Sequence, residues 1–108
     1  MNETLPVALI TGASRGLGRG IAARLASLGF SVGINYVNNS SAANETVALC
    51  KQHQLKENQR FIPMKADMGI RDDRTMLFEK TLQEFGRIDA FISNAGIGPR
   101  ARADITET

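Results

Sequence analysis

A run of eight residues near the amino terminus combines three glycines with two side chains that can bind phosphate. It reads Thr11, Gly12, Ala13, Ser14, Arg15, Gly16, Leu17, Gly18. Gly12 can take a positive φ in a sharp turn. Gly16 lets a pyrophosphate approach the backbone, and Gly18 lets a helix pack closely. The Ser14 hydroxyl and the Arg15 guanidinium add hydrogen-bond donors. The run therefore predicts a dinucleotide-binding turn.

The elements around this turn are those that a phosphate site requires. Residues 5–11 form a short apolar strand before it. A helix follows, with its predicted face made of Leu17, Ile21, Leu25 and Leu28. Its N-terminus offers free N–H groups and a positive dipole end to phosphates. The spacing is G-x-x-x-G-x-G rather than the commoner G-x-G-x-x-G, and an ordinary strand-to-helix turn with packing glycines is the alternative.

The end of the second predicted strand, residues 30–36, indicates which nicotinamide cofactor is bound. NAD-binding folds place an acidic residue there, about 20 residues past the glycines, to hold the ribose 2′-hydroxyl. Here Asn35 and Tyr36 stand at that place, with no carboxylate to repel a 2′-phosphate. Arg15 could bind that phosphate, so we expect NADP(H) to be preferred over NAD(H). The alternative is that Arg15 is only a solvated charge.

The rest of the chain continues the alternation of strands and helices. We predict a helix over residues 42–53, a strand over 61–65, a helix with the face Phe78, Leu82 and Phe85, and a strand over 88–93. This βαβαβαβ order predicts an α/β fold with a doubly wound parallel sheet of Rossmann type and strand order 3-2-1-4. Residues 1–108 form one unit, without an internal repeat or linker.

Composition narrows the classes of function. The net charge of +2 and the absence of a basic run favour neither nucleic acid nor a membrane surface as partner. The sequence shows no secretion signal, so we expect a cytoplasmic protein. One Cys and one His can build neither a disulfide framework nor a zinc site. Cys50 and His53 are three residues apart, and we favour a semi-buried thiol and a solvated imidazole over a nucleophilic pair.

Three motifs together resemble the short-chain dehydrogenase/reductase family, specifically the group with 3-oxoacyl-[acyl-carrier-protein] reductases. They are the glycine turn, the Ala66-Asp67-Met68 stretch, and the end of the last strand, Ser93-Asn94-Ala95-Gly96. Ser93 stands where the family has a first Asn. The resemblance implies that Asp67 and Met68 read the adenine. It also implies that Asn94, Ala95 and Gly96 line the adenosine ribose side and stabilise the central strand. From the residues alone, Asp67 could instead cap the next helix, although a carboxylate at the end of a strand is suited to accept from the adenine amino group.

The resemblance also implies oxidoreductase chemistry, which interconverts a carbonyl and an alcohol, with a small carbonyl compound or an acyl thioester as substrate. The resemblance further implies that the full-length protein forms a homo-oligomer. The family's Y-x-x-x-K is absent, because Ser40 stands four residues after Tyr36, the one tyrosine. We therefore name no catalytic residue and expect an NADP(H)-binding half-domain that is truncated before the catalytic half. A stand-alone, inactive dinucleotide-binding module or a gene fragment is the alternative.

Overall fold

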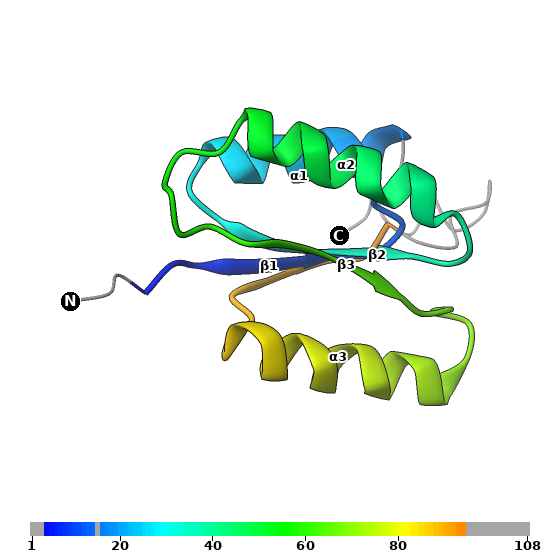
Figure 1. Ribbon diagram of the computed structural model, residues 1–108. Coiled ribbons are helices and arrows are strands. Elements are labelled where there is room, and N and C mark those ends of the chain that lie inside the picture. Colours follow the sequence, from blue (N-terminus) through cyan, green and yellow to red (C-terminus); the bar gives the residue numbers. More distant parts are fainter. Residues whose placement is uncertain (1–3, 15, 95–108) are drawn as a thin grey trace, which may run out of the picture.

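Four parallel strands form one sheet in the order β3-β2-β1-β4, and three helices connect them (Figure 1). The computed structural model describes residues 4–14 and 16–94. The elements are β1 (Val7–Ile10), α1 (Gly16–Ser27), β2 (Ser31–Tyr36), α2 (Ser40–Gln52), β3 (Phe61–Lys65), α3 (Arg71–Phe85) and β4 (Ala90–Ile92). The predicted fold class and strand order are confirmed. The strands β1 and β4 are shorter than the predicted ranges.

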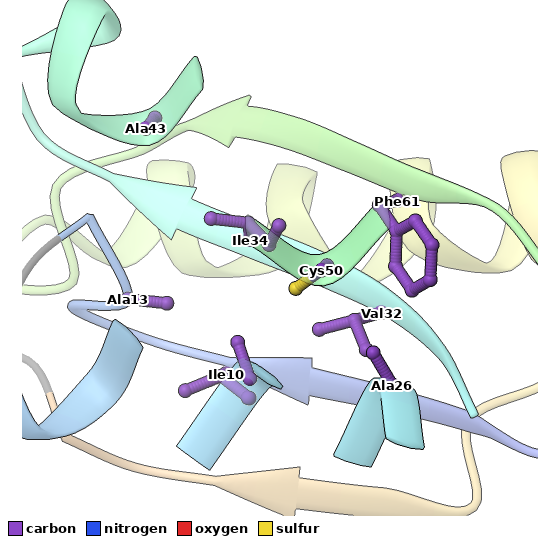
Figure 2. Packing of buried hydrophobic residues seen from close by; sticks show 9 residues of the cluster. Ile10, Ala13, Ala26, Val32, Ile34, Ala43, Cys50 and Phe61 are labelled. Carbon is purple, nitrogen blue, oxygen red and sulfur yellow. The ribbon is translucent and has the colours of Figure 1, made fainter. Parts of the chain in front are cut away.

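The helices α1 and α2 cover one face of the sheet, and α3 covers the other (Figure 1). Figure 2 shows the core on the first face, where Ile10, Val32 and Ile34 of the sheet meet small residues of the helices, such as Ala26 and Ala43. These side chains are inaccessible to solvent. Because alanine side chains are short, both helices can lie close to the strands.

The predicted face of α1 is wrong at both ends. Leu17 is 70% exposed and Leu28 is 53% exposed, whereas the fully buried positions are Ala22 and Ala26. A pattern based on large apolar residues missed these alanines. Leu17 is instead the second residue of α1, at the rim of the glycine turn.

The predicted face of α3 is also only partly correct. Leu77 and Thr81 are its buried residues, while Leu82 is 50% exposed. The Thr81 hydroxyl donates to the Leu77 carbonyl at 2.7 Å, so a polar residue can face the sheet without losing hydrogen bonds. Phe78 and Phe85 are partly buried against the same cluster. The helix is therefore rotated relative to the pattern that large apolar residues suggest.

Two helix boundaries follow from capping. The helix α2 begins at Ser40, two residues before the predicted start, because the Asn39 side chain accepts from the Ala42 N–H at 2.9 Å. The helix α3 ends at Phe85 and is capped by Gly86, which adopts a left-handed φ of 84°.

The strand β3 lies at one edge of the described sheet and carries a proline in its middle. The backbone carbonyl of Arg60 and the N–H of Ala66 both bond to β2, at 2.9 and 3.0 Å. The backbone N–H and C=O groups of successive residues point alternately to the two sides of a strand. Residues 60 and 66 face β2, so the even-numbered residues between them also face β2 and Pro63 directs its nitrogen to the open edge. A proline there removes no hydrogen bond from the sheet.

Candidate functional site

The carboxyl ends of the strands bring most of the predicted site residues to one edge of the sheet. The glycine turn follows β1, Tyr36 ends β2, Asp67 follows β3 and Asn94 follows β4. The chain runs outward from β1 through β2 to β3 and then crosses to β4 on the other side of β1. Ligands of doubly wound sheets bind at such a reversal of strand order, outside the carboxyl ends of the strands.

The glycine turn has the backbone conformation that its sequence predicts. Gly12 has a φ of 65° and Gly16 a φ of 64°, both in the left-handed region. A Cβ built on Gly16 meets no atom within 4 Å, so the space beside its backbone is open. A Cβ on Gly18 would lie 2.4 Å from the Gly12 carbonyl oxygen. The turn is therefore open where a pyrophosphate would approach and closed where the helix packs.

Asn94 connects the end of β4 to this turn. Its Nδ2 donates to the Gly12 carbonyl at 3.1 Å, and its backbone N–H donates to the Thr11 Oγ1 at 2.8 Å. The Thr11 N–H in turn donates to the Ile92 carbonyl at 3.0 Å. These bonds close the reversal point between β1 and β4 and hold the turn in one orientation.

Asn35 lies behind the turn and is completely buried. Its Oδ1 accepts from the Gly12 N–H at 3.3 Å, and its Nδ2 donates to the carbonyls of Met64 and Ala66 at 3.2 and 3.1 Å. The side chain thus joins the glycine turn to the end of β3. Because these bonds use its amide from within the core, Asn35 supports the site rather than facing its surface.

The turn after β3 places Asp67 and Met68 at the same edge, both partly exposed. Asp67 accepts from the Gly69 N–H at 2.9 Å through Oδ1, and the Asp73 carboxylate accepts from the Asp67 N–H at 2.8 Å. Arg74 donates to the Met68 carbonyl at 2.8 Å. The turn is therefore fixed from the first turn of α3, with the Asp67 carboxylate partly accessible.

Of the other predicted site residues, Ser14 is partly buried and Tyr36 packs partly buried against the core, whereas Arg15, Ala95 and Gly96 lie outside the described residues. Sequence reasoning missed Arg19 and Thr46, whose side chains bind the carbonyls of the glycine turn. No local pattern could have found Thr46, since it lies on α2.

The Cys50 and His53 pair forms no site. Cys50 is completely buried, more than the semi-buried position predicted, and burial raises the pKa of its thiol to about 11. His53 is exposed at the C-terminal cap of α2. A thiol with this pKa is protonated at neutral pH and a poor nucleophile.

A cavity of about 180 Å³ lies at the opposite, amino-terminal end of the strands, beside Val7, Phe85 and Arg87. Its arginines are paired within the protein, Arg60 with Glu84 at 3.1 Å and Arg87 with Asp89 at 2.7 Å. It is separate from the glycine turn.

Among residues 4–14 and 16–94, no group of three or more His, Cys, Asp or Glu residues is placed to hold a metal ion. No helix in that part of the chain is long and apolar enough to cross a membrane.

A family model described as short chain dehydrogenase matches residues 6–108. A tetrahydroxynaphthalene reductase of Pestalotiopsis fici is 46% identical over 91 residues, which are 84% of this chain and 31% of that protein. A 3-oxoacyl-[acyl-carrier-protein] reductase of Synechocystis is 39% identical over 94 residues, 87% of this chain and 36% of that protein. The chain spans about a third of the length of these relatives.

Solved structures show the same fold. A levodione reductase is 32% identical with a TM-score of 0.79, over 89% of this chain and 36% of its own. A dehydrogenase from Burkholderia cenocepacia with bound NADP, described as putative, is 30% identical with a TM-score of 0.73, over 83% of this chain and 34% of its own.

Proposed function

The chain belongs to the short-chain dehydrogenase family, and from that premise we propose that the protein is an NADP(H)-dependent oxidoreductase that interconverts a carbonyl and an alcohol. The observation that carries the proposal is the open glycine turn, tied by Asn94 to the point where the strand order reverses. That position is where doubly wound folds bind dinucleotides.

In this proposal the pyrophosphate lies against the N-terminus of α1. The open space beside Gly16 fits a phosphate that approaches the backbone. The first N–H groups of a helix have no partner within it, and the positive end of its dipole favours an anion. The Ser14 hydroxyl adds a donor, and the exposed Leu17 lies beside the turn. The bound nicotinamide would supply or accept the hydride.

The adenosine half of the cofactor would extend toward the ends of β2 and β3. We propose that the Asp67 carboxylate accepts from the adenine amino group and that the Met68 backbone lies beside the ring. Tyr36 ends β2 beside them, and Asn35 holds the two turns together from below. Ala95 and Gly96 follow Asn94 in sequence, and we assign them to the ribose side.

The preference for NADP(H) rests on charge. The segment 36–41, from the end of β2 into α2, contains no carboxylate, so nothing there repels a 2′-phosphate. Arg15 is the cation that we assign to that phosphate. The Burkholderia relative with bound NADP supports the choice. A charge-assisted hydrogen bond of about 1.5–3 kcal/mol corresponds to roughly ten- to hundredfold in affinity.

The substrate class follows from the relatives alone. Two of them are named for reduction of a hydroxynaphthalene and of a 3-oxoacyl thioester. We therefore propose a small carbonyl compound or an acyl thioester.

Calorimetric titration of the purified protein with NADP⁺ and NAD⁺ tests cofactor choice. NADP⁺ should bind at least tenfold tighter, and Arg15→Ala should remove the difference. Equal affinities of the unchanged protein would contradict the preference. NADPH consumption with a panel of ketones, quinones and acetoacetyl thioesters then separates an oxidoreductase from a module that binds the dinucleotide without turnover.

A further inference from the structure

The carbonyl oxygens of the glycine turn would repel a phosphate if they pointed toward it. Each peptide unit carries a donor and an acceptor, and a carbonyl directed at a phosphate would repel it. A phosphate-binding turn therefore needs other partners for its carbonyls. Three successive carbonyls of this turn, those of Gly12, Ala13 and Ser14, all accept hydrogen bonds from side chains elsewhere in the chain.

Two of these three carbonyls are bound by α1 and α2 rather than by a strand end. The Thr46 Oγ1 lies 2.9 Å from the Ala13 carbonyl oxygen and 3.1 Å from that of Ser14. Arg19 donates through Nη2 to the Ser14 carbonyl and, at 3.0 Å, to the carbonyl of Ala42 in the first turn of α2. Thr46 is completely buried, so water cannot replace its hydroxyl.

The two side chains act together. The Arg19 Nε donates to the Thr46 Oγ1 at 3.0 Å, so the hydroxyl accepts from arginine and its own proton remains for a carbonyl. Ala13 offers the shortest such contact. Glu45 pairs with Arg19 at 3.3 Å from the exposed side and helps to hold the guanidinium in place.

The orientation of one carbonyl also sets the orientation of a donor. In a trans peptide the C=O of one residue and the N–H of the next point in opposite directions. The bond from Thr46 to the Ala13 carbonyl therefore turns the Ser14 N–H away from α2. The Ser14 N–H is then on the opposite side of the peptide from the Ala13 carbonyl oxygen, which is bound by Thr46.

We propose that Thr46 and Arg19 are positioning residues for the phosphates of the cofactor. They hold the carbonyls of Ala13 and Ser14 away from the phosphate and fix the donors of the turn without touching the ligand. The inference rests on the proposed function, since it requires a phosphate-bearing ligand at the turn. It makes α2, which carries no glycine-turn residue, a determinant of phosphate affinity.

Thr46→Val removes the hydroxyl while keeping the shape of the side chain, and Thr46→Ser retains the hydroxyl. Calorimetry with NADP⁺ and an NMR titration with adenosine, which has no phosphate, measure the two halves of the site. Thr46→Val should bind NADP⁺ about tenfold more weakly, as expected for one lost hydrogen bond, and adenosine as the unchanged protein does. Thr46→Ser should stay within about twofold of the unchanged protein for both ligands.

A second pair of variants covers the case in which Thr46→Val does not fold. Arg19→Met keeps most of the aliphatic stem and removes the donors, and Arg24→Met, in the last turn of the same helix, makes the same change in net charge. Only Arg19→Met should weaken NADP⁺ binding about tenfold or more. Equal NADP⁺ affinity of Arg19→Met and Arg24→Met, or equal losses for NADP⁺ and adenosine, would overturn the inference. Failure of the unchanged protein to bind NADP⁺ would instead overturn the proposed function.

Discussion

The side-chain amide of Asn94 lies where a side chain on Gly18 would begin. The Asn94 Nδ2 is 2.8 Å from the position that a Gly18 Cβ would take, and the Gly12 carbonyl oxygen is 2.4 Å from it. The end of β4 and the start of α1 are therefore in contact only because residue 18 has no side chain. The glycine is required by packing rather than by its own φ.

Gly18→Ala should destabilise the fold by about 3 kcal/mol, because the contacting carbonyl belongs to backbone that cannot move aside. Gly20→Ala, in the same helix, is the matched control, since a Cβ there meets no atom within 4 Å. That variant should stabilise the protein by about 0.5–1 kcal/mol. Urea denaturation of both variants measures the difference. Equal effects of the two substitutions would contradict the packing argument.

Asn35→Asp should make stability depend on pH. The new carboxylate would face the carbonyls of Met64 and Ala66 from a fully buried position. Burial and these carbonyls would raise its pKa in the folded state above that in the unfolded state. The variant should therefore lose about 3 kcal/mol at neutral pH and recover part of it as the pH falls toward 5.

Asn38→Asp, in the exposed loop after β2, is the control for adding one negative charge. Denaturation of the two variants and the unchanged protein at pH 5, 6, 7 and 8 separates them. A stability difference between Asn35→Asp and the unchanged protein that stays constant over this range would contradict the raised pKa of the buried carboxyl.

Asp89 should contribute to stability only above acidic pH. The Arg87 guanidinium, and next the backbone N–H of Val7, lower the pKa of this carboxyl in the folded state. Because the folded pKa is lower than the unfolded one, the stabilisation is present above about pH 4 and disappears as the pH falls through the folded pKa. Asp89→Asn should thus be less stable at pH 7, with a smaller deficit near pH 3. Glu79→Gln, on the exposed side of α3, serves as control, and an undiminished Asp89→Asn deficit at pH 3 would contradict this account.

Cys50 should react with thiol reagents only when the protein opens. Its thiol is completely buried and has a pKa of about 11. With a stability of about 5 kcal/mol or more, labelling at pH 8 should be at least roughly a thousandfold slower than in denaturant. Added NADP⁺ should slow it further if the cofactor binds the folded state. Labelling in buffer as fast as in denaturant would contradict the buried position.

The order of strands and helices was predictable from the sequence because short apolar runs alternate with longer helical segments. The sharp turn after the first strand was also predictable, because Gly12 takes the positive φ expected of it. The orientation of the helices was less predictable. On α3 the pattern favoured Leu82, but Thr81 faces the sheet because its hydroxyl is satisfied within the helix.

The candidate site could be predicted where it depends on consecutive residues and not where it depends on distant ones. The glycine turn carries its own signal in spacing and residue type. Thr46 is separated from Ala13 by 33 positions, and a buried threonine on a helix resembles any other helical threonine in sequence. Asn35 was predicted to belong to the cofactor site. Its side chain is buried, and its bonds to Gly12 and Ala66 connect the glycine turn to the turn after β3.

The proline of β3 gives the two sides of the described sheet unequal capacities for strand addition. Pro63 has no N–H to donate to a carbonyl of a strand added beyond β3. The hydrogen bonds between the two strands would therefore be interrupted in the middle of the five-residue strand β3. The three residues of β4 contain no such interruption. A further strand, from the same chain or from another molecule, would therefore pair more completely beside β4 than beside β3.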